Sequence, residues 1–293
     1  MEGNLAAVVG QFQITDDLPS SLRVDSRELL ASTTRLLGAR LGEIEIDTYL
    51  AITARYVELG KPADGKCHST ILALAKTLYN GEVGGANRAQ VSKALINLYR
   101  VEIQMAGIWA GTDDFDEAFL NFERILNNLR FHEQINKGRR ARDLLDPAII
   151  GAQRDSTVQW QFADWHVQQI RNGYWIELDW DRLRSLSGAA KMLWLILSAP
   201  RFQFRPSAEG TDLEELCVPL SPEAYRALGI RASRPRDCRR TLDEAGQRVV
   251  AVDQTYVDFS IGPDPRAPRE RVLRVLRRRN TPQLQLAELT EQR

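Results

Sequence analysis

The sequence predicts an α+β protein built from two tandem winged-helix domains and a short basic C-terminal tail. Residues 69–98 and 221–245 each have the pattern of a helix, a glycine-containing turn and a second helix. β-prone sequence follows both stretches, which is the layout of a helix-turn-helix with a wing. With 293 residues and 43% hydrophobic residues, the chain is long enough for about two such domains.

The domain boundaries follow from changes in composition along the chain. We expect an N-terminal arm over residues 1–25 and a first winged-helix domain over residues 26–145. A second, DNA-binding winged-helix domain is expected over residues 155–262. Residues 263–293, rich in arginine and then in polar residues, form the predicted tail.

The helices of the first domain are predicted from apolar spacing. Apolar residues from Ile46 to Val57 recur at helical intervals and stop at Gly60, a good helix terminator. Ser69 is a candidate cap of the next helix, and a loose turn with three glycines follows it. In the helix predicted over residues 88–98, the apolar positions are Val91, Leu95 and Leu98.

The other face of that helix is short, polar and basic, and therefore suits base edges and phosphates. Its expected DNA-contacting residues are Arg88, Gln90, Ser92, Lys93 and Asn97. A merely structural or dimerising role of this first domain remains an equal alternative. We also expect Arg139 and Arg140, in the basic run of residues 137–142, to lie near phosphate in a linker or a wing tip.

Strands are predicted after the first helix pair. Residues 101–109 have the composition of a strand, whereas the pattern of residues 119–133 fits a strand and a helix equally well. Val158, Trp160 and Phe162 alternate with polar residues and predict another strand. The dense tryptophans of this region are expected in the core, with stacking on single-stranded bases as the alternative.

The second domain repeats the plan. After a buried helix over residues 187–199, Ser221 and Pro222 begin a short helix that ends at Gly229. Ser233 is the expected cap of the second helix, whose inward positions are Cys238, Leu242 and Ala245. Residues 249–252 and 256–261 are predicted as the two strands of the wing.

A recognition helix needs guanidinium or small polar side chains near its N-terminus, which enters the groove. The sequence supplies four arginines there as expected DNA contacts, namely Arg234, Arg236, Arg239 and Arg240. Net charge agrees: residues 1–60 carry −4, whereas residues 181–279 carry +6, although the whole chain is neutral. A solvated charged surface is the alternative interpretation of this asymmetry.

No pattern of catalysis, cofactor binding or metal binding is found. The chain has no phosphate-binding loop, and its three cysteines and three histidines share no motif, so we expect a non-enzyme without cofactor or metal. His166 is expected to be a packed core residue and not a base. The absence of a long apolar run and of a basic leader predicts a cytoplasmic protein with reduced thiols.

The C-terminal segment contains Gln283, Leu284 and Leu286, which resemble the Gln-Leu-x-Leu-Phe peptide that bacterial proteins dock into the sliding clamp. Ala287 stands where that peptide has a large apolar residue. Clamp binding by these residues is therefore a hypothesis beside the simpler one of a disordered end.

Residues 157–199 and 234–250 resemble plasmid replication initiators, closest to the TrfA type, in the strand, the Leu-Ser-x-x-Ala helix beginning at Leu186, and the arginine-rich helix. The resemblance implies a non-enzymatic initiator of plasmid replication that binds direct repeats in double-stranded origin DNA and helps to melt an A·T-rich segment. It also implies recruitment of the host replication initiator, helicase and clamp, and self-association as a dimer that is usually inhibitory.

Two other functions fit less of the sequence. A winged-helix transcriptional regulator would make the same DNA contacts, but no separate ligand or dimerisation domain is visible. A nuclease or strand-transfer enzyme would need a metal or nucleophile motif, which the sequence lacks.

Overall fold

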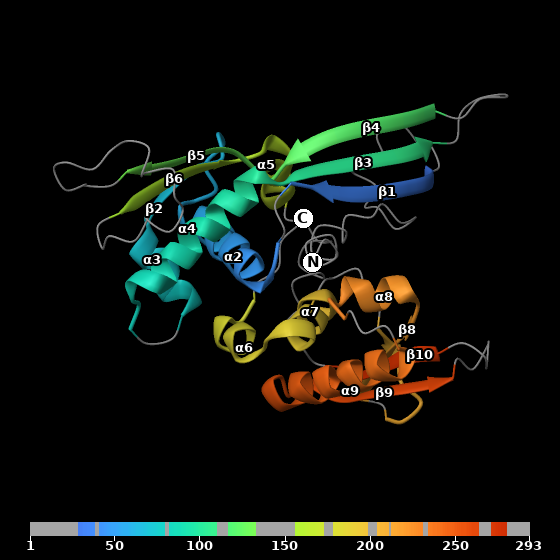
Figure 1. Cartoon of the computed structure of the whole chain (residues 1–293). Helices are drawn as coiled ribbons and strands as arrows, with labels where there is room; N and C mark the ends of the chain where they lie inside the picture. Colours follow the sequence, from blue (N-terminus) through green and yellow to red (C-terminus); the bar gives the residue numbers. More distant parts are fainter. Residues whose placement is uncertain are drawn as a thin grey trace. The chain divides into compact units, whose positions relative to one another are not determined.

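The computed structural model of the chain contains helices and antiparallel sheets, as the predicted mixed fold requires. The structure describes residues 29–38, 41–79, 82–109, 117–132, 156–172, 178–198, 204–210, 212–230, 234–263 and 271–279. The chain divides into two compact units, Met1–Glu177 and Leu178–Arg293 (Figure 1). The division falls later than the segment of residues 146–154 that we expected between the domains.

The first unit contains a cluster of helices around an apolar core. Its helices are α2 (Glu43–Glu58), α3 (Ile71–Leu78), α4 (Gly85–Arg100) and α5 (Asp164–Arg171). α2 buries Ile46, Ile52 and Tyr56, as its helical spacing predicts. The hydroxyl of Thr70, not that of Ser69, caps α3 by accepting a hydrogen bond from the amide of Ala73 at 3.0 Å.

A three-stranded antiparallel sheet completes the core of this unit. It consists of β2 (Lys66–Thr70), β5 (Leu126–His132) and β6 (Thr157–Phe162), in the order β2-β6-β5. Along β6, Val158, Trp160 and Phe162 are buried, which confirms the predicted alternation. Trp160 is 2% exposed and therefore belongs to the core, not to a stacking platform.

A second sheet in the first unit was only partly predicted. β1 (Leu29–Leu37), β3 (Glu102–Trp109) and β4 (Glu117–Arg124) pair in the antiparallel order β1-β3-β4. β3 confirms the strand predicted over residues 101–109. Within the ambiguous stretch of residues 119–133, the described residues 119–132 form parts of two strands, β4 and β5, which are separated at the buried Ile125.

The second unit has the same kinds of element. Its helices are α6 (Trp180–Ser185), α7 (Gly188–Leu197), α8 (Pro222–Ala227) and α9 (Pro235–Val252). Its strands are β7 (Arg205–Pro206), β8 (Leu213–Pro219), β9 (Tyr256–Pro263) and β10 (Arg271–Arg278), in the order β7-β8-β10-β9. The Ser221 hydroxyl accepts a hydrogen bond from Ala224 at the start of α8, and Gly229 has the positive φ of 73° that the turn after α8 requires.

The two units share one order of elements. In each, a helix (α2 or α7) leads to a strand (β2 or β8), then to two helices, and then to two strands. In each sheet the last of these strands, β6 or β10, lies between the other two. The first unit differs by inserting β3 and β4 after its third helix, and the second by the two-residue strand β7 before β8.

Two predictions for the second unit were wrong. Residues 249–252 were expected to be a strand, but they continue α9, because Val249 extends the buried stripe of Cys238, Leu242 and Ala245. The helix stripe outweighs the β-propensity of the valines. Residues 263–293 were expected to be a tail, yet residues 271–278 form β10, which pairs with both β8 and β9.

None of the described helices has both the length and the apolar sequence needed to cross a bilayer.

Candidate nucleic-acid interface

The start of α9 presents a group of arginines. Pro235 occupies the first turn, where no hydrogen bond is lost through its missing N–H. The helix buries one stripe of residues, from Cys238 to Val249, against the sheet. Gly246 makes that packing close, since a Cβ there would lie 2.6 Å from Cβ of Phe259 on β9. Arg234, Arg236 and Arg240 are exposed on the opposite side, as expected, and Arg239 is half-buried.

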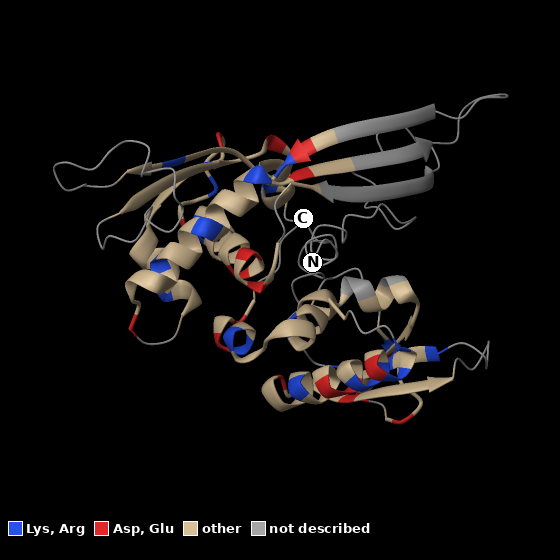
Figure 2. Cartoon of the chain, in the orientation of Figure 1, with Lys and Arg blue, Asp and Glu red and all other residues tan. Residues whose placement is uncertain are grey.

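These arginines differ in the ion pairs and hydrogen bonds that they form within the unit. Arg240 lies 3.5 Å from the carboxylate of Asp237 and 4.0 Å from that of Glu244. Arg239 donates from Nε to the carbonyl of Pro235 at 3.4 Å. Arg234 and Arg236 form no ion pair within the described part of the chain. Figure 2 shows the resulting mixture of basic and acidic residues along α9.

α4 carries the corresponding candidates of the first unit, and it has basic residues but no acidic ones (Figure 2). Gln90 and Lys93 are exposed, and Arg88 is half-buried, with its guanidinium donating to the carbonyl of Val83 at 3.2 Å. The amide oxygen of Gln90 accepts a hydrogen bond from the Tyr79 hydroxyl at 2.7 Å. These side chains lie on one helix and remain candidates for contact with DNA.

Two residues expected on that surface are engaged inside the unit. Ser92 is fully buried, so the prediction that it points outward was wrong. The reason is that α4 packs against α2, α3 and β5 and therefore buries more than one narrow stripe. Asn97 is half-buried and donates 2.8 Å to the carboxylate of Glu45, whose other oxygen accepts from the Gly42 amide.

Several arginines that contribute to the positive charge of residues 181–279 are used within the second unit. Arg274 binds the carboxylates of Glu215 and Glu209 at 2.8 and 2.6 Å, and its hydrogen bond lowers the pKa of Glu215. Arg277 is 8% exposed, pairs with Glu214 at 3.1 Å and lies 3.7 Å from the centre of the Phe204 ring. The charge asymmetry of the sequence therefore overstates the basic charge available to a ligand.

A buried polar group fixes the C-terminal end of α9. Asp253, 4% exposed, accepts hydrogen bonds from Trp194 Nε1 and Arg182, both at 2.8 Å. Burial alone would raise the pKa of Asp253, but the hydrogen bonds from Trp194 and Thr255, together with the charge of Arg182, lower it. Because the group joins α6, α7 and α9, it helps to hold the candidate helix in place.

His166 lies in the core of the first unit, as predicted. It is 3% exposed, its Nδ1 lies 3.2 Å from the Tyr49 hydroxyl, and burial lowers its pKa to about 3. Among the described residues, no three His, Cys, Asp or Glu side chains come together as metal ligands would. The described histidines and carboxylates therefore offer no metal site to examine.

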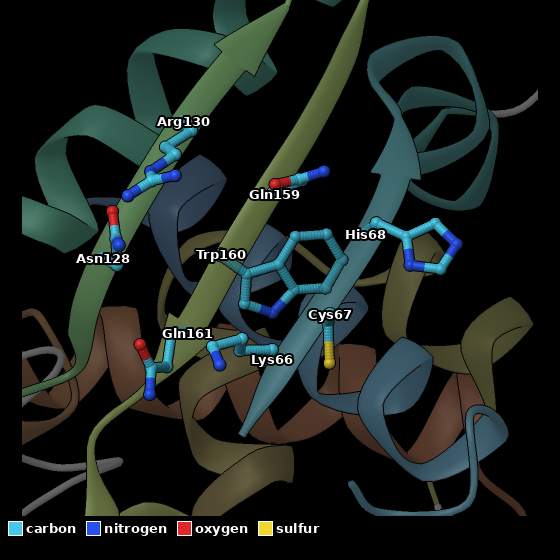
Figure 3. Close-up of a pocket in the computed structure, with 8 residues that line it drawn as sticks. All are labelled: Lys66, Cys67, His68, Asn128, Arg130, Gln159, Trp160 and Gln161. Carbon is cyan, nitrogen blue, oxygen red and sulfur yellow. The ribbon is translucent and has the colours of Figure 1, made fainter. Parts of the chain in front are cut away.

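A polar hollow lies on the outer surface of the β2-β6-β5 sheet (Figure 3). Its volume is about 280 Å³, and no pattern in the sequence predicted it. The residues that line it come from all three strands and are Lys66, Cys67, His68, Asn128, Arg130, Gln159, Trp160 and Gln161.

Five of the residues expected to contact DNA or a partner protein are not among those that the structure describes. Arg139, Arg140, Gln283, Leu284 and Leu286 lie outside the described residues. The wing-tip and clamp hypotheses therefore stay predictions.

Comparison with known proteins identifies a fold but no family. No protein-family model matches the sequence, and no curated protein matches it. Two solved structures of domains 2 and 3 of RctB are similar. One, a selenomethionine derivative, has a TM-score of 0.56 at 9% identity and covers 86% of this chain and 90% of its own. The other has a TM-score of 0.54 at 10% identity and covers 86% and 91%. The chain therefore shares the fold of these two domains.

Proposed function

We propose that the chain is a double-stranded DNA-binding protein with two winged-helix units, and that it initiates replication at origin repeats. The observation that carries the proposal is the repeated topology. Both units follow the order helix, strand, helix, helix, strand, strand, with the last strand in the middle of the sheet. This is the arrangement in which a winged helix presents its third helix to a major groove.

The side chains of α4 and α9 support contact with DNA. The exposed arginines at the start of α9 suit guanine and phosphate, and exposed Gln90 and Lys93 on α4 suit adenine and phosphate. Two such helices in one polypeptide would bind two segments of one duplex. Affinity would come from phosphate contacts and specificity from the base contacts.

The role in replication initiation rests on the resemblance of residues 157–199 and 234–250 to plasmid replication initiators. The fold shared with domains 2 and 3 of RctB agrees with two linked units of this kind. A host replication initiator, a helicase and the sliding clamp are the expected partners, with dimerisation as a further expectation. The proposed activity needs no catalytic residue and no cofactor.

Substitution in α9 tests the DNA-binding step. Arg236→Ala should weaken binding to the cognate repeat by ~1–3 kcal/mol, because a base-reading contact is lost. Arg248→Ala is the matched control, since Arg248 is equally exposed on the same helix but lies three turns further along. Equal affinities of the two variants, measured by fluorescence anisotropy, would remove the start of α9 from the interface.

Footprinting on the DNA that flanks the protein's own gene tests the replication role. Regularly spaced protected repeats, together with replication of a plasmid that carries only the gene and those repeats, are expected. Protection of a single operator without replication would instead favour a transcriptional regulator.

A further inference from the structure

The outer surface of the β2-β6-β5 sheet has an unusual composition. Alternate residues of the three strands point away from the helices, and those around the hollow are all basic or amide side chains. Strand register places Gln161 between Lys66 and Asn128, and Gln159 between His68 and Arg130. Figure 3 shows these six side chains in two rows across the strands. We call this set the outer polar face.

The outer polar face offers many hydrogen-bond donors and two permanent positive charges. No acidic residue lines the hollow. Asp64 lies at one end, where its carboxylate pairs with Lys66 at 3.0 Å and its carbonyl accepts from Gln161 at 3.0 Å. Arg130 forms no ion pair within the described part of the chain. Its guanidinium can therefore donate two parallel hydrogen bonds to one carboxylate.

The second unit gives an example of carboxylates bound to an arginine of a sheet, there on the middle strand. There, Arg274 in the middle strand β10 is neutralised by Glu215 on β8 and by Glu209. Glu209 belongs to the segment that follows β7, a short strand paired with the outer edge of β8. The second unit thus supplies its own sheet with an extended segment and a carboxylate. The corresponding strand of the first unit, β2, is a terminal strand, and no strand pairs with its outer edge within the described ranges.

We propose that the outer polar face binds an extended acidic segment of a partner protein. The segment would run from the free edge of β2 across the strands of this face, where a carboxylate would bind Arg130 on β5. The amides of Gln159 and Asn128 would hydrogen-bond to its polar groups. This surface is formed by the sheet and not by α4, so the inference goes beyond the proposed function and does not depend on it.

A nucleic acid fits this surface less well. Single-stranded binding sites stack bases on several exposed aromatic rings, but Trp160 is 2% exposed, and the ring of His68 is the exposed one in the lining of the hollow. Phosphate tracking also needs a row of cations, and this face has two permanent ones, of which Lys66 already pairs with Asp64.

A labelled peptide provides the test. The full chain is titrated against a fluorescein-labelled peptide of alternating valine and glutamate, and binding is followed by anisotropy. We expect saturable binding that weakens with added salt and falls about tenfold in Arg130→Gln, because a charge-assisted contact is lost. Lys76→Gln, which removes an exposed charge from α3, is the control and should bind normally. Thermal unfolding and binding to the origin repeat should be unchanged in both variants.

Three outcomes would overturn the proposal. The first is the absence of saturable binding by the wild-type chain, and the second is equal binding of a peptide with lysine in place of glutamate. The third is binding of a labelled oligo-dT that depends on Arg130 when the acidic peptide does not bind, which would make the face a nucleic-acid surface. Because repeat binding is measured in the same samples, a failure here is distinguishable from a failure of the proposed DNA contacts.

Discussion

The two units share one topology, but different kinds of residue stabilise their cores. In the first unit the core next to the sheet is aromatic, with Tyr56, Phe162 and His166 in contact as rings. In the second unit, ion pairs with buried carboxylates take part, namely Arg182 with Asp253 at the C-terminal end of α9 and Arg277 with Glu214. The fold therefore does not dictate how its centre is stabilised, and each unit should respond to a different perturbation.

The two sheets also differ on their outer surfaces. In the middle strand of the second unit, Val272, Leu273, Val275 and Leu276 are all buried, so both sides of β10 are covered. In the first unit the middle strand buries Val158 and Trp160 but exposes Gln159. With the same strand order, the middle strand of the first unit thus exposes a polar side chain, whereas the described middle strand of the second unit is covered on both sides.

The largest expected effect breaks the polar interior of the second unit. Asp253→Ala would leave Trp194 Nε1 and Arg182 without the carboxylate that now binds both. We expect a loss of about 3 kcal/mol in the free energy of unfolding, because a buried donor loses its acceptor and an ion pair is broken. Urea denaturation measures it. Asp243→Ala, on the exposed face of α9, should change stability by less than about 0.5 kcal/mol.

Hydrogen exchange would assign that loss to one unit. Peptides from α7 and α9 should lose protection in Asp253→Ala, whereas peptides from α2 and α4 should keep it. Equal loss in both units would show that the two interiors are not stabilised independently.

Acid should instead act first on the first unit. The pKa of His166 is about 3 in the folded chain and about 6.5 when unfolded, so between these values only the unfolded state binds the proton. Stability therefore falls as the pH falls through this window, by about 1.4 kcal/mol per pH unit and by about 2 kcal/mol from pH 7 to pH 5. The contribution of Asp253, whose pKa is lowered, is lost only below the unfolded value of about 4.

Denaturation at pH 7 and pH 5 with segment-resolved hydrogen exchange tests this order. α2 and α5 should lose protection at pH 5 before α7 and α9 do. The His166→Gln variant should show a smaller change between the two pH values. An unchanged pH dependence in that variant would mean that another group titrates.

Gly246 tests the close contact between α9 and the sheet. Gly246→Ala places a methyl group 2.6 Å from Cβ of Phe259, an atom fixed to its backbone. Overpacking of this kind costs about 1–3 kcal/mol, from which the better helix propensity of alanine recovers up to about 1 kcal/mol. Thermal unfolding should show a net loss of about 1 kcal/mol. A more stable variant would show that α9 can move away from β9.

Helices with a single apolar stripe were predictable from the sequence. Val91, Leu95 and Leu98 on α4, and Cys238, Leu242 and Ala245 on α9, are all buried where a period of 3.6 places them. Burial was predicted less well in a helix that packs against several elements. Ser92 on α4 is buried by contacts with other elements, and no local sequence pattern indicates such contacts.

β10 shows why a strand in the middle of a sheet can be missed. Its buried residues come in adjacent pairs, Val272 with Leu273 and Val275 with Leu276, since both of its surfaces are covered. Alternation, the main signal of a half-buried strand, is therefore absent. Arg274 and Arg277 also made this segment resemble a basic tail. In the structure, their charges are paired with Glu215 and Glu214, which allows them to lie within the strand.

The candidate DNA surface was predictable only as far as helix position. Sequence indicated that arginines gather at the start of α9, and Arg234 and Arg236 are exposed there. It did not indicate that Arg240 shares its charge with Asp237 and Glu244. The outer polar face was missed altogether, because its six residues come from strands that lie far apart in the sequence.

The smallest expected effect concerns the acidic residues that distinguish α9 from α4. Glu244 lies 4.0 Å from Arg240 and competes with phosphate for its charge, whereas α4 has no acidic residue. Glu244→Gln should therefore strengthen binding to the repeat by about 0.5 kcal/mol, a value typical of an exposed ion pair. The gain should shrink as salt is added, because both interactions are screened. Asp258→Asn, exposed on β9, is the control for the simple change in net charge. An equal gain in both variants would mean that overall charge, and not the local competition for Arg240, sets the affinity.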